Sequence, residues 1–195
     1  MRTLYILFLV ALATFLMAAD CSNKDSEFYN DVFVSAPNLV TIARSVIPEE
    51  QTVFVIASVN RFLSITGQNN LLDIYKTTGG AVKLNFSYEL EKQNNTNWDD
   101  VTLSDNQLQI VKGEAVSGEF VDAFCVYNTA NQTYESEVGI TSLPAGNYRL
   151  SFGFNSDAIT DIDFRSLSFN SNLFLNLKSS SVALNNQGFY LFTIQ

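Results

Sequence analysis

Three aspartates follow one another closely near the C-terminal third of the chain. Asp157, Asp161 and Asp163 lie in the stretch Asn-Ser-Asp-Ala-Ile-Thr-Asp-Ile-Asp, which begins at Asn155. Carboxylate oxygens at such spacing could bind Ca²⁺, a hard cation that prefers oxygen ligands. The stretch lacks the spacing and the turn glycine of an EF-hand loop. The favoured interpretation is a structural acidic loop, with a calcium site as the alternative.

A second group of candidate residues is the sequence Trp98-Asp99-Asp100. An exposed tryptophan ring can stack on a sugar, and two carboxylates at the right separation can hydrolyse a glycoside. Asparagines at positions 94, 95 and 97 precede these residues, as in a solvated loop. The favoured interpretation is a solvated loop, with a sugar-binding site at Trp98, Asp99 and Asp100 and a carboxylate-only glycoside hydrolase as alternatives.

The chain contains no histidine. This excludes histidine-dependent triads, Cys–His dyads and metal sites with imidazole ligands. Cys125 lies on the same face of an expected strand as Val121 and Ala123, so we expect a core side chain and no nucleophile. The residue types thus predict a non-enzymatic protein with no catalytic residue and no cofactor, apart from the calcium alternative.

The N-terminus carries an export signal. Met1-Arg2 precedes an apolar run from Leu4 to Ala19, followed by Asp20 and Cys21. Its sixteen residues are short of the roughly 20 that span a bilayer core, so we predict a signal peptide over residues 1–20. Cleavage before Cys21 would leave a cysteine to carry a lipid. Ordinary cleavage would instead permit a Cys21–Cys125 disulfide in an exported compartment.

The segment Ala18-Ala19-Asp20-Cys21 resembles a relaxed lipobox, and Cys21 to Glu27 resembles the polar, acidic leader of Bacteroidota lipoproteins, flavobacterial ones especially. The Asn-rich loops and short aromatic strands that follow are similar in style to the small surface lipoproteins of those bacteria. This resemblance implies lipidation at Cys21 and anchoring in the bilayer at the outer membrane or cell surface. The partner would be an envelope protein or a glycan, and a periplasmic or secreted protein is the alternative.

Charge and composition restrict the partners and the number of domains. The net charge is −9, from 11 basic and 20 acidic residues, and no basic cluster is present. Nucleic acid is therefore excluded as a partner, because its phosphates require clustered Lys and Arg. The apolar share of 47% predicts one well-packed domain. We expect a flexible polar tether over residues 21–36 and a β-domain over residues 37–195.

Apolar and polar residues alternate along most of that domain, as in half-buried strands. The clearest case is Val82 to Glu91, where Val82, Leu84, Phe86, Tyr88 and Leu90 share one face. A hairpin turn is expected at Thr77 to Gly80, and Glu119 to Tyr127 is expected to be a central strand covered on both faces. The remaining predicted strands are Thr52–Val59, Leu71–Lys76, Gln107–Lys112, Tyr134–Ile140, Tyr148–Asn155, Leu173–Lys178 and Phe189–Ile194.

About ten strands at such intervals predict an all-β fold, a single antiparallel β-sandwich of the Ig-like type. The segment Leu143 to Leu150 resembles the turn-into-strand segment of Ig-like and fibronectin-type bacterial modules. That resemblance implies that Tyr148 packs or bonds across the corner. A lipocalin-like β-barrel is the alternative fold.

Overall fold

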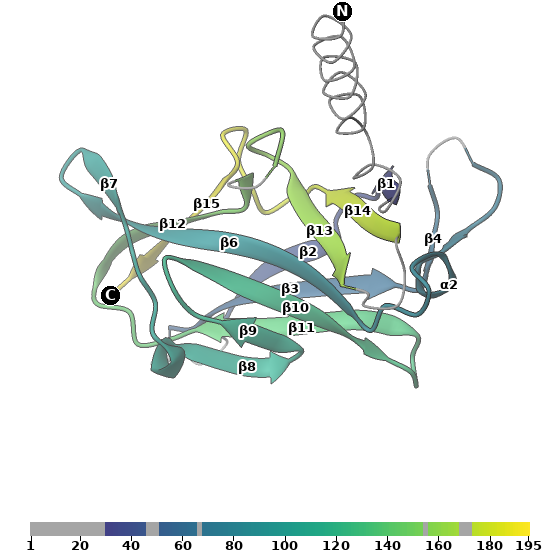
Figure 1. Cartoon of the computed structure of the whole chain (residues 1–195). Helices are drawn as coiled ribbons and strands as arrows, with labels where there is room; N and C mark the ends of the chain where they lie inside the picture. Colours follow the sequence, from purple (N-terminus) through teal and green to yellow (C-terminus); the bar gives the residue numbers. More distant parts are fainter. Residues whose placement is uncertain (1–29, 46–50, 66–67, 154–155, 168–172) are drawn as a thin grey trace, which may run out of the picture. The chain divides into compact units, whose positions relative to one another are not determined.

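The computed structural model describes residues 30–45, 51–65, 68–153, 156–167 and 173–195. One compact unit covers Asp31–Gln195, and it is built almost entirely of strands (Figure 1). None of the helices in these ranges is long and apolar enough to cross a bilayer. The predicted all-β class is confirmed.

Thirteen of the described strands share one hydrogen-bonded sheet, and β4 and β5 form a separate pair. The strands are β1 (Asn30–Ser35), β2 (Val40–Arg44), β3 (Val53–Asn60), β4 (Phe62–Leu63), β5 (Leu72–Asp73), β6 (Lys83–Asn94), β7 (Asn97–Asp100), β8 (Leu108–Lys112), β9 (Glu114–Val116), β10 (Phe120–Asn128), β11 (Thr133–Ile140), β12 (Gly146–Ser151), β13 (Ile162–Leu167), β14 (Leu173–Ser179) and β15 (Phe189–Ile194). The helical turns are α2 (Ile74–Thr77) and η2 (Asp105–Gln107).

The alternating sequence of β6 decides which side chains enter the core. Leu84, Phe86, Tyr88 and Leu90 are all at most 2% exposed, as the pattern predicts. Val82 was expected on the same face and is 54% exposed, because it precedes the strand. The core collects the equivalent inward positions of the other long strands, and their burial is the main source of stability.

The sheet follows the order β1-β14-β13-β6-β10-β11-β3-β2, and β12 and β15 branch from β6 (Figure 1). The chain between β1 and β2 connects the two ends of this order. The N–H groups of Ala36 and Asn38 donate to the carbonyls of Lys178 and Ser180, and the Leu39 carbonyl accepts from Ser58 N–H. The sheet is therefore curled, because one short segment bonds to both β14 and β3.

The bonds from Ala36 to Lys178 and from Asn38 to Ser180 show that these two segments run parallel, since both residue numbers increase in the same direction. The other pairings that involve the long strands β3, β6, β10, β11 and β12 are antiparallel. The sheet is thus mixed where a wholly antiparallel one was expected. The expected central position of β10 is confirmed, since β6 lies on one side and β11 and β9 lie on the other. The expected covering of both its faces is wrong, because the outward side chains are only half-buried and Phe120 is 36% exposed.

Gly113 lies at the tip of a wedge between β10 and β11. Strands β8 and β9 enter between these two, β8 pairing with β11 and β9 with β10. Gly113 has φ +75°, and a Cβ there would lie 2.4 Å from the Phe124 carbonyl oxygen and 2.8 Å from that of Glu135. Only glycine accommodates both the backbone conformation and this close approach.

Three predicted boundaries are wrong, the first being that of Tyr148–Asn155, where β12 covers Gly146–Ser151. The tether was expected to reach residue 36, but β1 begins at Asn30, because Val32 and Val34 are half-buried against the core. Leu71–Lys76 was expected as one strand before a hairpin turn, but only Leu72–Asp73 is extended. The Asp73 carboxylate accepts from Lys76 N–H at 3.0 Å and so starts the one-turn helix α2 in place of the strand.

Candidate functional site

The outer face of β6, β13, β14 and β1 carries a polar cleft of about 480 Å³. Its side chains come from the outward positions of these strands. Arg165 on β13 is paired in register with Asn85 on β6 and with Asn176 on β14. One pleat away, Asp163 is paired with Lys178. The strand alternation that buries the core thus presents two rows of polar side chains to the cleft.

The charges of the cleft are balanced. Asp157 and Asp163 line it together with Arg165 and Lys178, two carboxylates and two cations. Lys178 Nζ lies 2.5 Å from Asp157 Oδ2. Arg165 lies 3.9 Å from Asp31 and over the ring of Phe174. The four charged side chains that line the cleft sum to zero, and Asp31 beside Arg165 adds one further carboxylate.

Asp163 and Asp157 have carboxyl groups in different electrostatic environments. Burial raises the pKa of Asp163, and nearby Lys178 partly offsets that effect. Asp163 Oδ1 is buried without a hydrogen-bond partner among the described residues. The hydrogen bond from Lys178 lowers the pKa of Asp157, whose side chain is 89% exposed. Of the two carboxyl groups, Asp163 is the more easily protonated.

Phe33 is an aromatic side chain at the β1 side of the cleft. It is 68% exposed and lines the cleft, whereas Phe86 and Phe164 line it from below with side chains buried in the core. The exposed Phe33 ring is available for stacking. Sequence reasoning missed Phe33, because residues 21–36 were read as a tether. The apolar run Val32-Phe33-Val34 within the otherwise polar segment was the signal that could have found it.

The structure brings together only two of the three aspartates of the acidic loop. Asp157 and Asp163 line the cleft, while Asp161 lines a neighbouring hollow beside Lys178. Over the described ranges, no group of three or more His, Cys, Asp or Glu side chains is arranged to hold a metal ion. Asn155, at the start of the loop, lies outside the described residues. The calcium site stays a prediction. One of its expected ligands, Asp157, is ion-paired with Lys178.

Trp98 lies on β7, which pairs with β6, and it belongs to a different cluster. The guanidinium of Arg149 lies 4.6 Å from the Trp98 ring centroid and 4.0 Å from that of Phe189. It also binds both carboxylate oxygens of Glu91 at 2.6 Å. Arg149 thus occupies one face of the Trp98 ring.

The two aspartates that follow Trp98 are exposed. Asp99 Oδ2 accepts a hydrogen bond from Asn94 Nδ2 at 2.9 Å, and Asp100 pairs in register with Glu91 along β6. These residues lie on β7, and neither lines the polar cleft. The sugar-binding role of Trp98, Asp99 and Asp100 stays a prediction.

Cys125 is a fully buried free thiol in the core, as the strand pattern predicted. Burial raises its pKa well above the usual thiol value, which suppresses the reactive thiolate. Cys21, the predicted lipidation site, lies outside the described residues.

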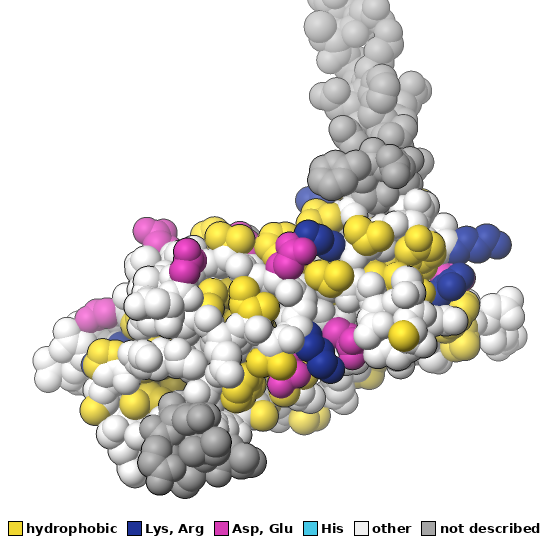
Figure 2. Space-filling model, turned by 90° about the horizontal axis from the view of Figure 1, so that it is seen from below, with side chains coloured by type: hydrophobic (Ala, Val, Ile, Leu, Met, Phe, Trp, Pro, Cys, Tyr) yellow, Lys and Arg dark blue, Asp and Glu magenta, His cyan; other side chains and the backbone are white. Residues whose placement is uncertain are grey.

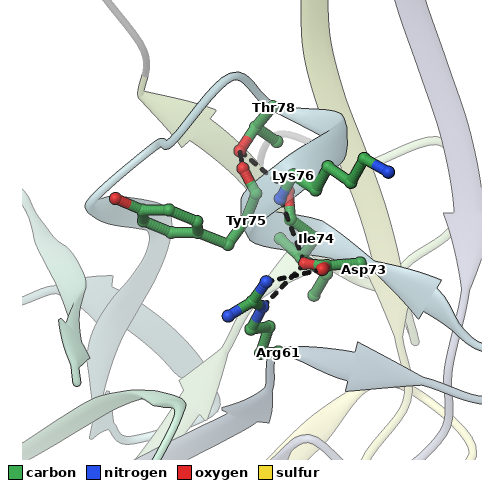
Figure 3. Close-up of polar contacts among 6 residues, drawn as sticks. All are labelled: Arg61, Asp73, Ile74, Tyr75, Lys76 and Thr78. Atoms are coloured by element: carbon green, nitrogen blue, oxygen red, sulfur yellow. Dashed lines mark hydrogen bonds and ion pairs between the residues drawn. The ribbon is translucent and has the colours of Figure 1, made fainter.

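An ion pair closes the segment that contains β4 and β5, by joining Arg61, which follows β3, to Asp73 at the end of β5 (Figure 3). Arg61 binds both oxygens of Asp73 at 2.8 and 2.7 Å, and its guanidinium lies 5.5 Å from the Tyr75 ring centroid. The Arg61 hydrogen bond is the main cause that lowers the pKa of Asp73. Tyr75 in turn stacks on Tyr127 of β10. The Asp73 carboxylate and the Thr78 hydroxyl are both hydrogen-bonded within the cluster, so we interpret it as structural.

Strands β8 and β9 carry exposed apolar side chains. Ile110, Val111 and Val116 are 48%, 50% and 57% exposed. Figure 2 shows that hydrophobic side chains on the face seen from below lie in several separate groups, with polar atoms between them. A continuous apolar surface is the usual mark of a protein interface, and this face lacks one. The polar cleft is the stronger candidate site.

Comparison with known proteins adds no further assignment. No family model, curated protein or solved structure matches the chain.

Proposed function

We propose that this chain is an exported, lipid-anchored protein of the bacterial cell envelope that binds a ligand and does not catalyse a reaction. The observation that carries the binding role is the polar cleft on the outer face of β6, β13, β14 and β1. Its volume of about 480 Å³ falls in the range of small-molecule sites. Export and anchoring are supported by the leader over residues 1–20 and by Cys21.

The absence of histidine supports binding over catalysis, because the commonest proton-transfer group is missing from the whole sequence. The net charge of −9 supports a partner other than nucleic acid or an anionic lipid surface. Contact with the membrane would then come through the lipid alone.

Metabolic labelling with palmitate tests the anchor. The wild-type protein should incorporate the label and fractionate with membranes, and Cys21→Ala should do neither. Cys125→Ala is the matched control and should label like the wild type, because Cys125 is buried. Recovery of unlabelled wild-type protein from the cytosol would refute the export and anchoring proposal.

A carboxylate-only glycoside hydrolase is the second candidate, because Asp157 and Asp163 line the same cleft. The two pKa values are displaced in opposite directions, as in an acid paired with an ionised carboxylate. Release of reducing sugar by the wild type, and its loss in Asp163→Asn, would favour this candidate. Binding without release would favour the non-catalytic role.

The Ig-like character of the body belongs to the same proposal. It is supported by the corner at β12, where the Tyr148 hydroxyl donates to the Pro144 carbonyl at 2.6 Å and the ring is 1% exposed. A tyrosine bonded to backbone a few residues upstream is typical of Ig-like corners.

A further inference from the structure

We propose that the outer cleft binds a neutral saccharide, with the ring of Phe33 stacking on one face of a sugar. This inference rests on the proposed binding function and assigns its ligand class. Three features of the cleft carry it: the balance of its charges, the type of its polar groups and the exposed aromatic ring beside them.

The charge balance selects a neutral ligand. Two carboxylates and two cations line the cleft, and Lys178 already binds Asp157. A phosphate or carboxylate ligand would have to compete with Asp157 and Asp163 for the cations, and it would approach a protein of net charge −9. A neutral ligand neither competes with these carboxylates nor is repelled by the net negative charge.

The polar groups suit a ligand rich in hydroxyls. The amide nitrogens of Asn85 and Asn176 already donate to the Ala123 carbonyl at 3.4 Å and to Asp31 Oδ1 at 2.9 Å. Each amide therefore offers its oxygen and one remaining N–H, and Asp163 adds carboxylate oxygens. These side chains belong to three adjacent strands, so they are spaced across about 10 Å at the usual strand separation. A hydroxyl can both donate and accept, so a sugar can satisfy amides and carboxylates together.

Phe33 supplies the apolar part of the recognition. Its ring is 68% exposed at the edge of the cleft, and β1 is held beside β14 by sheet pairing. The C–H face of a sugar ring is apolar, so covering Phe33 with it removes apolar surface from water on both partners. A sugar therefore matches the ring and the polar rows at once.

The test uses the full-length mature protein, extracted in a detergent without a sugar head group. The probes are an array of neutral gluco-, manno- and galacto-configured oligosaccharides, with sulfated and sialylated glycans as the anionic arm. Titration calorimetry then measures the affinity for the best neutral oligosaccharide. We expect saturable binding that changes less than about twofold between 0.05 and 0.5 M salt, since a neutral ligand is not screened.

The variant Phe33→Leu keeps an apolar side chain on β1 and removes the ring, and it should weaken binding by about tenfold or more. Asn85→Leu should weaken binding similarly, and it decides the outcome if Phe33→Leu fails to fold. Phe62→Ala is the control, because Phe62 is an exposed aromatic on β4, which contributes no residue to the cleft. Circular dichroism confirms that each variant is folded.

Three outcomes would overturn the saccharide assignment: no neutral oligosaccharide binds, only anionic glycans bind, or Phe33→Leu and Asn85→Leu bind like the wild type. Loss of binding in Trp98→Ala alone would place the sugar at β7 instead. None of these results depends on palmitate labelling, so the ligand class and the anchoring proposal fail separately.

Discussion

The ion pair between Glu91 and Arg149 tests how much a shielded salt bridge contributes to the stability of the sheet. The two residues face each other in register on β6 and β12, and their side chains are 12% and 21% exposed. Both guanidinium contacts to the carboxylate measure 2.6 Å, and the rings of Trp98 and Phe189 flank the same guanidinium. The pair is therefore shielded from water in a way that ordinary surface pairs are not.

We expect Arg149→Met to lower the free energy of unfolding by about 3 kcal/mol, because it leaves the carboxylate of Glu91 mostly buried without its cation. Glu91→Gln should cost about 1–2 kcal/mol, since the amide retains one hydrogen bond. The double variant should cost less than the sum, with a coupling energy of about 1.5–3 kcal/mol. For a domain of this size, 3 kcal/mol corresponds to a fall in Tm of about 6–12 °C.

Urea unfolding followed by circular dichroism measures each value, and equal m-values show that the unfolded states are comparable. Glu114→Gln is the matched control. Its ion pair with Lys83 is equally short at 2.7 Å, but the two side chains are 55% and 33% exposed, so the cost should stay within about 0.5 kcal/mol. A coupling energy below about 0.5 kcal/mol for Glu91 and Arg149 would refute the reasoning.

Three further predictions concern other parts of the fold. Gly113→Ala should lower the free energy of unfolding in urea by about 3 kcal/mol or more, because its Cβ would collide with backbone at φ +75°. The control Gly118→Ala, whose Cβ meets only one atom at 3.4 Å, should lower it by less than about 1 kcal/mol. Equal losses would contradict the wedge geometry. Arg61 lowers the folded-state pKa of Asp73, so this carboxylate stabilises the fold above its unfolded-state pKa of about 3.9, and the stabilisation is lost as pH falls through the folded-state pKa. The difference in unfolding free energy between the wild type and Asp73→Asn should therefore shrink from pH 7 to pH 2. A difference that stays constant over this range would exclude the linkage. Burial raises the pKa of Cys125, so alkylation at pH 8, followed by peptide mass spectrometry, should be slow at this thiol in native protein and fast in urea; rapid native labelling would show that the core opens at β10.

The sequence predicts the buried side chains correctly wherever apolar and polar residues alternate along a strand that has one face on the core. The period-two pattern of β6 predicts its inward side chains, because a strand with one face on the core must alternate. Cys125 follows the same rule on β10. The pattern fails where a local contact competes with it. The Asp73 carboxylate caps a helical turn, and residues 74–77 leave the extended conformation although Ile, Tyr and Thr favour strands.

The cleft could not be predicted in the same way. Asn85 is far from Arg165 and Asn176 in the chain, and only the order β6-β13-β14 places the three in one row. Loop closure and strand order depend on the free energy of the whole packed sheet, which no local segment encodes. By itself the sequence determined the all-β class, the inward face of the long strands, the burial of Cys125 and the exclusion of histidine chemistry. Only the tertiary structure decided which outward side chains meet, because neighbours across a sheet are set by pairing between distant segments.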